Sequence, residues 1–295
     1  MKIKAAVLGV LLLNSLAGKG LAEVKPVQIS LLYEGTKLRA NGAWWIPEKV
    51  DPTRTGTILW LHGTLQSHQM REPIQAMASR WMEAGIPVLA ITLTLGIDDR
   101  KEPYDCSVPH RHTYKQIMAE LTAWIEWLKA RNVRKVVLAG HSRGGQQVIL
   151  FAAQRSDPTI KGVLGVAPSV GQPSDHPALE TARKLFFSGK RDSLITTDFL
   201  FCRNTKVSAR TLLSYYETRQ DIREVIPKLK VPVMIAVGSE DEILGDVAGK
   251  LKDVAKQPNV TIETIDFADH FFRDMAADDL ADVTVPFIKQ WLGIR

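Results

Sequence analysis

The ten residues at 136–145, Val-Val-Leu-Ala-Gly-His-Ser-Arg-Gly-Gly, constrain the fold more than any other stretch of the chain. The first four are apolar, which predicts a short strand buried on both faces. The strand leads into Gly140-His141-Ser142-Arg143-Gly144, a G-x-S-x-G pattern, and a helix-compatible segment follows as far as Gln154. A strand, a sharp turn and a helix in this order would lift Ser142 above the edge of a sheet, beside a helix N-terminus.

The same pattern makes Ser142 a candidate nucleophile. Glycines two residues before and after it would prevent a clash at the turn, and the helix N-terminus would favour developing negative charge. The alternative is a glycine-rich turn between strand and helix in which the serine only caps the helix. Because a serine hydroxyl is a poor nucleophile at neutral pH, the catalytic interpretation requires a base and an orienting acid elsewhere.

Candidates for both follow along the chain. An apolar strand at 231–238 is followed by Ser239-Glu240-Asp241-Glu242, and another at 260–265 is followed by a loop that contains His270. Since the carboxyl ends of parallel strands meet at one edge of the sheet, both loops should lie near Ser142.

With these motifs in this order, the chain resembles the α/β-hydrolase family over nearly its whole length after the first few dozen residues. The resemblance implies that the acid stands three residues after the glycine that ends its strand, which selects Asp241 over Glu240 and Glu242. It also implies His270 as the base. The alternatives are a solvated acidic loop and a surface histidine, and Asp269 is expected to be a loop or capping residue.

A fourth element, the strand 57–61 running into His62-Gly63-Thr64, resembles the oxyanion-hole loop of that family. Two backbone N–H groups must point at the tetrahedral oxyanion. By position, Thr64 would supply one and Arg143 the other, with Leu65 as the alternative to Thr64.

The remaining histidines are expected to be structural. His62 would brace its loop by hydrogen bonding, and His141 would support the neighbourhood of the serine. His110 and His112 have no third ligand within reach in the sequence, and we expect them in a solvated loop. No nucleotide-binding glycine-rich loop or paired-cysteine zinc pattern is present, so we expect neither metal nor cofactor.

The rest of the chain predicts one mostly parallel, doubly wound α/β domain over residues 23–295, with helices on both faces of the sheet. After a β region at 27–46, strands are expected around Leu59, Val88, Val137, Val163, Met234 and Ile262, and helices at 71–84, 113–130, 143–154, 243–256 and 280–292.

Residues 171–227 interrupt this alternation. They lie where α/β-hydrolases often insert a cap, and they contain six Phe and Tyr residues among polar ones. A cap over Ser142 would exclude water and shape the substrate site. The alternative is a lengthened helix pair that packs its aromatic side chains into the core.

Residues 1–22 have the pattern of a secretory signal peptide. Lys2 and Lys4 precede an apolar run at 5–13 that is too short for a stable membrane span, and Gly20-Leu21-Ala22 suits cleavage before Glu23. No later run is long enough to cross a membrane. We therefore expect an exported protein, in the periplasm of a Gram-negative bacterium or secreted.

Export affects how charge and cysteines are interpreted. Cleavage removes three lysines and no acid, which lowers the formal net charge from +6 to +3. No basic stripe interleaved with aromatic residues remains, so nucleic-acid binding is not indicated. An oxidising compartment would allow Cys106 and Cys202, the only cysteines, to form a disulfide between the predicted cap and the core. Two unpaired buried thiols are the alternative.

Together these features predict an exported serine hydrolase that cleaves a small-molecule carboxylic ester, or an amide or thioester, through an acyl-enzyme. An acyltransferase or a cofactor-free haloperoxidase could use the same three residues. A non-catalytic binding protein on the same scaffold is the alternative from another class. No pattern in the sequence indicates an oligomeric state.

Overall fold

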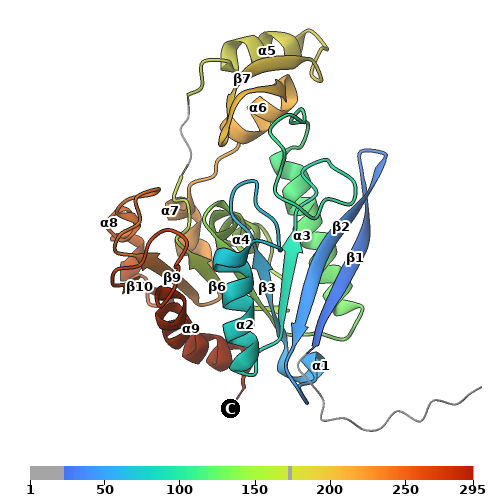
Figure 1. Cartoon of the computed structure of the whole chain (residues 1–295). Helices are drawn as coiled ribbons and strands as arrows, with labels where there is room; N and C mark the ends of the chain where they lie inside the picture. Colours follow the sequence, from blue (N-terminus) through green and yellow to red (C-terminus); the bar gives the residue numbers. More distant parts are fainter. Residues whose placement is uncertain (1–22, 172–174, 295) are drawn as a thin grey trace, which may run out of the picture.

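Buried apolar runs form a central eight-stranded sheet in the order β1-β2-β4-β3-β5-β6-β9-β10 (Figure 1). The structure, a computed structural model, describes residues 23–171 and 175–294, so the predicted signal peptide lies outside the described residues. The strands are β1 (Glu23–Tyr33), β2 (Thr36–Ile46), β3 (Thr57–Leu61), β4 (Val88–Thr92), β5 (Val136–His141), β6 (Ile160–Val166), β9 (Val233–Gly238) and β10 (Val260–Ile265).

The sheet is mostly parallel, as predicted. β1 and β2 form an antiparallel hairpin and β2 runs antiparallel to β4, whereas all the other neighbouring strands run parallel. The register pairs Leu61 with Gly140, Gly140 with Gly165, and Gly165 with Ile235. The carboxyl ends of β3, β5, β6 and β9 therefore lie side by side, and the loops that follow them share one edge.

Helices cover both faces of this sheet (Figure 1). α3 (Tyr114–Lys129) and α4 (Arg143–Gln154) pack into one apolar core, and α2 (Ala76–Glu83) and α9 (Ala276–Leu292) pack into the other. α3 shows why: its buried Ile117, Leu121, Trp124 and Leu128 recur at helical spacing on one side. Shorter turns are α1 (Pro52–Thr55), η1 (Arg71–Gln75) and η3 (Val254–Lys256).

One predicted helix is wrong. Residues 243–256 do not form a continuous helix, because only α8 (Val247–Lys250) and the short η3 turn are helical. Gly245 has a φ of 64°, outside the helical region, and the Asp246 side chain accepts a hydrogen bond from Gly249 N to start α8 anew. The apolar spacing is helical, but glycine and a capping aspartate interrupt the backbone.

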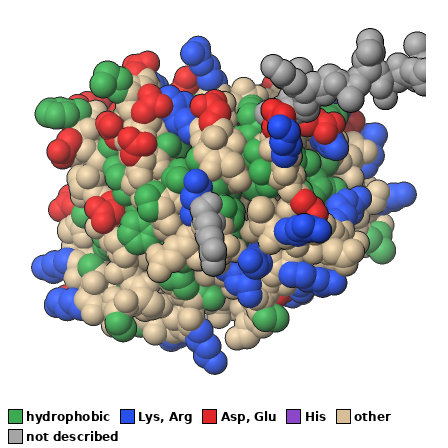
Figure 2. Space-filling model, turned by 90° about the horizontal axis from the view of Figure 1, so that it is seen from below, with side chains coloured by type: hydrophobic (Ala, Val, Ile, Leu, Met, Phe, Trp, Pro, Cys, Tyr) green, Lys and Arg blue, Asp and Glu red, His purple; other side chains and the backbone are tan. Residues whose placement is uncertain are grey.

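The segment after β6 forms a separate layer. It contains α5 (Leu179–Phe187), β7 (Leu194–Phe199), β8 (Cys202–Ser208), α6 (Ala209–Tyr216), α7 (Ile222–Val225) and η2 (Ile226–Lys228). β7 and β8 form their own two-stranded antiparallel sheet. Figure 1 shows α5, β7 and α6 beyond the end of the main sheet where α3 begins. The opposite face of the molecule carries scattered basic, acidic and apolar side chains (Figure 2).

The aromatic side chains of this layer divide between its interior and its surface. Phe199 and Tyr215 are almost completely buried, whereas Phe187 and Phe201 are exposed. Within the described residues, no helix is both long and apolar enough to cross a membrane.

Candidate active site

Ser142 stands at a tight turn between β5 and α4. Its φ of 54° and ψ of −122° are rare for a residue with a side chain, which marks a strained backbone. A Cβ atom at Gly140 would come within 2.3 Å of Gly144 O, and one at Gly144 within 2.3 Å of His62 O. Only glycine fits at either position, so the spacing of the sequence motif follows from the closeness of the backbone at this turn.

Asp241 and His270 form a buried pair at the same edge of the sheet. His270 Nδ1 donates to Asp241 Oδ2 at 2.7 Å, and the two side chains are 4% and 1% exposed. The other carboxylate oxygen, Oδ1, accepts from Ile243 N at 2.9 Å and Leu244 N at 2.8 Å. Three donors thus fix the carboxylate. Asp269 instead accepts from the backbone of its own loop and pairs with Arg273.

His141 connects the serine turn to the histidine loop. Its ring lies 4.8 Å from that of His270, and its Nε2 donates to the His270 carbonyl at 2.8 Å. Burial lowers the pKa of His141 to about 3, so the ring is neutral at neutral pH. His141 is therefore a neutral donor that bonds the loop containing His270 to the turn containing Ser142, in keeping with the structural role expected for it.

The loop after β3 lies against Ser142. A Cβ atom at Gly63 would stand 3.3 Å from Ser142 Cβ, and Arg143 Nε donates to Thr64 Oγ1 at 3.2 Å. Leu65, the alternative to Thr64, has a φ of 59°, and its carbonyl accepts from Tyr104 N. The structure brings Thr64 and Arg143 together next to the serine, where two oxyanion donors would have to be.

His62 braces this loop, as its sequence position indicated. Leu93 N donates to His62 Nε2 at 3.1 Å, while His62 Nδ1 donates to Gly63 O at 2.7 Å, which identifies a neutral ring protonated on Nδ1. Burial, with the nearby Arg100 guanidinium, holds the pKa of His62 well below its usual value. Arg100 also donates to Gln66 O and Leu93 O, so one side chain joins the loops after β3 and β4.

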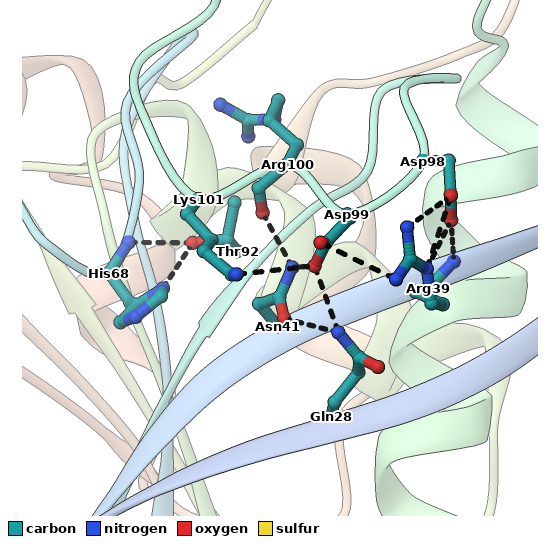
Figure 3. A network of polar contacts seen from close by, with 9 residues as sticks. All are labelled: Gln28, Arg39, Asn41, His68, Thr92, Asp98, Asp99, Arg100 and Lys101. Carbon is teal, nitrogen blue, oxygen red and sulfur yellow. Dashed lines mark hydrogen bonds and ion pairs between the residues drawn. The ribbon is translucent and has the colours of Figure 1, made fainter.

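A polar network extends this support to the β1–β2 hairpin (Figure 3). Asp99 accepts from Asn41 and Gln28, and Arg39 pairs with Asp98 and, at 3.5 Å, with Asp99. Asn41 Nδ2 also donates to the Arg100 carbonyl, and His68 is bonded to Thr92 through both its N–H and its ring. The loop after β4 is thus also bonded to the β1–β2 hairpin, and the loop after β3 is bonded to the end of β4.

A cavity of about 480 Å³ opens beside Ser142. Thr64, Ser142 and Arg143 line its inner part, and Phe201 of the loop between β7 and β8 contributes from the separate layer. Ile243 and Leu244, whose amides hold Asp241, form an apolar wall. The candidate nucleophile is therefore reached through a pocket large enough for a small organic substrate.

The expectation for His110 and His112 is wrong, because both side chains are completely buried. His110 Nδ1 lies 3.1 Å from His112 Nε2, and His112 Nδ1 lies 2.9 Å from the Tyr215 hydroxyl. His110 also stacks on Tyr104 and contacts Phe199. The separate layer covers this loop, which sequence spacing could not reveal. In residues 23–171 and 175–294, no three His, Cys, Asp or Glu side chains are grouped so that they could hold a metal ion.

Cys106 and Cys202 form a disulfide, with Cα atoms 5.3 Å apart. Beside it, Thr205 Oγ1 donates to Cys106 O, and His110 exchanges backbone hydrogen bonds with Lys206 and Ser208. The loop 104–112 therefore continues the edge of β8, and the separate layer is attached to the main domain both covalently and by hydrogen bonds.

Sequence reasoning missed several residues of this region. Arg100, which braces two loops, carries no motif, and neither do Arg223 and Lys250 at the rim of the cavity. Each is separated from Ser142 by many residues in the chain. Only the position of Arg100 shortly after an apolar strand, near the expected active-site edge, could have drawn attention to it.

The fold and the site define a doubly wound α/β protein with a buried Asp–His pair near a strained serine. The sequence pattern described as "Alpha/beta hydrolase family" matches residues 58–283, most of the chain. The chain therefore belongs to the alpha/beta hydrolase family, and the protein is a hydrolase. The comparison with curated proteins found no match.

Solved structures agree on the fold. Est1E from Butyrivibrio proteoclasticus, solved with ferulic acid bound, has a TM-score of 0.66 at 20% identity, covering 90% of this chain and 99% of that one. The alpha/beta hydrolase GrgF from Penicillium sp. sh18 has a TM-score of 0.68 at 15% identity, covering 92% and 100%. A monoacylglycerol lipase from Paleococcus ferrophilus has 0.59 at 17% identity, covering 91% and 99%.

Proposed function

We propose that this protein is a serine hydrolase that cleaves a carboxylic ester through an acyl-enzyme. The observation that carries the proposal is the buried hydrogen bond between Asp241 and His270, at the edge where Ser142 faces an open cavity. Esterases and lipases among the structures of similar fold are consistent with this reaction. Thioesters and amides would follow the same route.

In this mechanism Ser142 attacks the ester carbonyl, and His270 takes its hydroxyl proton on Nε2. Asp241 accepts from Nδ1 and so keeps Nε2 unprotonated until that moment. The backbone N–H groups of Thr64 and Arg143 stabilise the oxyanion, and the proton on His270 then passes to the leaving alcohol. A water molecule, deprotonated by His270, releases the acid and regenerates the serine.

We further propose that residues 171–227 act as a cap on a single domain at 23–295. Phe201 lines the cavity from this segment, and the Cys106–Cys202 disulfide ties the segment to the main domain. Such a cap would limit water and select substrates. The disulfide is also what an exported protein would form in an oxidising compartment, which supports residues 1–22 as a signal peptide.

The experiment is labelling with a fluorophosphonate followed by peptide mapping, together with hydrolysis of p-nitrophenyl acetate. We expect the label on Ser142 and loss of both labelling and turnover in Ser142→Ala. Ser169→Ala is the matched control, because Ser169 also lines the cavity. Label on another residue, or wild-type turnover by Ser142→Ala, would contradict the proposal. Ester product formed in preference to acid when an alcohol is added would identify an acyltransferase instead.

A further inference from the structure

The charged side chains that line the cavity beside Ser142 are all cationic. Three cationic side chains line it, those of Arg143, Arg223 and Lys250, and no acidic side chain is among the described residues of its lining. Arg143 lies at the inner end next to the serine. Lys250 and Arg223 are exposed and lie toward solvent, on two segments that are far apart in the sequence.

The two outer cations differ in how far their charge is compensated by neighbouring groups. Lys250 Nζ donates to the carbonyl of Leu244 at 2.5 Å, a neutral acceptor. Arg223 forms a two-point ion pair with Asp221, with Nη2 2.5 Å from Oδ2 and Nε 3.0 Å from both carboxylate oxygens, so much of its charge is offset, although the Arg223 side chain remains 54% exposed. Lys250 is therefore the main source of uncompensated charge at the outer part of the cavity. The buried carboxylate of Asp241 is held by His270 and two backbone amides.

The acidic and apolar residues of the loop at 239–247 line different hollows. The acidic residues Glu240, Asp241, Glu242 and Asp246 line an adjoining hollow of about 570 Å³, which shares Val247 with the Ser142 cavity. The same stretch of chain presents Ile243 and Leu244, not its acids, to the Ser142 cavity. A negatively charged molecule would therefore meet cations and apolar side chains beside the serine, with the acids of this loop lining the other hollow.

We propose that this cavity selects esters that carry a second, negatively charged group, a free carboxylate separated from the scissile bond by a short apolar spacer. The spacer lies against Phe201, Ile243 and Leu244, and the carboxylate lies between Lys250 and Arg223. The reaction is the one proposed above, on which this inference rests: water is consumed, the ester bond breaks, and the second carboxylate is unchanged.

The test compares substrates that differ only in charge. p-Acetoxybenzoate and p-acetoxybenzamide place the difference on the alcohol side. The mono-p-nitrophenyl ester of adipic acid and the p-nitrophenyl ester of adipamic acid, its monoamide, place the difference on the acyl side. In at least one pair we expect kcat/KM for the anion to exceed that of the amide about tenfold, as for hydrogen bonds to charged groups. High salt should reduce this preference.

Three variants locate the preference. Lys250→Gln should lower the anion-to-amide ratio about fivefold, the upper range for exposed charge pairs, and Arg223→Gln should lower it less, because Asp221 offsets the charge of Arg223. Lys252→Gln is the matched control, because it removes the same charge from an exposed side chain on the same segment outside the cavity lining. The ratio is taken on one enzyme preparation, so a smaller fraction of folded protein cancels.

The outcomes separate the two proposals. Hydrolysis of the amides without preference for the anion in either pair overturns the charge selection and leaves the ester hydrolase standing. A preference that Lys252→Gln reduces as much as Lys250→Gln also overturns it, because the overall charge of the surface would then be responsible. Failure to hydrolyse any of the four esters, with no fluorophosphonate label on Ser142, contradicts the proposed function itself.

Discussion

Replacing Asp241 with asparagine should disable His270 through the geometry of three hydrogen bonds. Oδ1 of Asp241 accepts from two backbone amides, Ile243 N and Leu244 N, and Oδ2 accepts from His270 Nδ1. Asparagine has only one acceptor atom. If its carbonyl remains with the two amides, its NH₂ group faces His270 Nδ1, and the imidazole must carry its proton on Nε2. A ring in that state cannot take the proton of Ser142.

The magnitude follows from the cost of the opposite orientation. Turning the amide of the side chain would restore the partner of His270 but leave two partly buried backbone N–H groups, those of Ile243 and Leu244, facing NH₂. A fully buried unsatisfied donor costs about 1–3 kcal/mol, so the harmful orientation is favoured by up to about 2–6 kcal/mol for the two. This corresponds to a loss in kcat of roughly 30-fold to 10⁴-fold, whose upper end agrees with the drop of about 10⁴ for the same change in a serine protease triad.

The assay is kcat and KM for p-nitrophenyl acetate, with folding checked by thermal denaturation. Glu240→Gln and Glu242→Gln are the controls, since they remove the same charge from neighbours that line the other hollow. We expect both to keep kcat within about threefold of wild type, as for exposed charges. An Asp241→Asn enzyme that retains more than a tenth of kcat would refute the reasoning, and so would a Glu240→Gln variant that is the most impaired of the three.

Three further outcomes are expected. Gly144→Ala would place a Cβ atom 2.3 Å from His62 O, so it should lower the free energy of unfolding by about 1–3 kcal/mol and reduce kcat, measured by urea unfolding and ester hydrolysis; an unchanged kcat would mean that the turn tolerates displacement. Reduction of the Cys106–Cys202 disulfide should lower the unfolding free energy by up to ~4–5 kcal/mol, since the disulfide joins cysteines 96 positions apart, and thiol titration before reduction should find no free cysteine. Burial lowers the pKa of His110 to about 4, so the neutral ring stabilises the fold fully above the unfolded-state pKa near 6.5, and this stabilisation is lost as the pH falls toward 4. The free energy of unfolding of His110→Gln should therefore fall less steeply than that of the wild type between these pH values. An identical slope would contradict a buried neutral His110.

The strands and the serine turn could be predicted from sequence because local patterns determine them. β3, β4 and β5 are continuous buried apolar runs, and Gly140 and Gly144 are required by contacts within one turn. The order of the strands places Asp241 and His270 at one edge, so their pairing follows from topology. These features depend on short-range sequence and on a rule of parallel sheets.

What could not be predicted depends on contacts between distant segments. His110 is buried because the separate layer covers its loop, and no pattern in the local sequence predicts this contact. The positions of Arg223 and Lys250 at one cavity likewise depend on how the short helices α7 and α8 lie relative to each other. The predicted helix at 243–256 is wrong for a local reason. The apolar spacing there is helical, but Gly245 has a positive φ and interrupts the helical backbone.

The attachment of the separate layer and the support of the loop beside Ser142 use the same segment, residues 93–112. Arg100 donates to Gln66 O, and Tyr104 N donates to Leu65 O, so this segment holds the loop that contains Thr64. A few residues later the same segment is bonded to β8 through Cys106 and through His110. A displacement of the layer would therefore be transmitted to one side of the proposed oxyanion site, whereas Asp241 and His270 rest on β9 and β10 and would be spared. Loosening the layer should for this reason impair the stabilisation of the oxyanion more than the transfer of the serine proton.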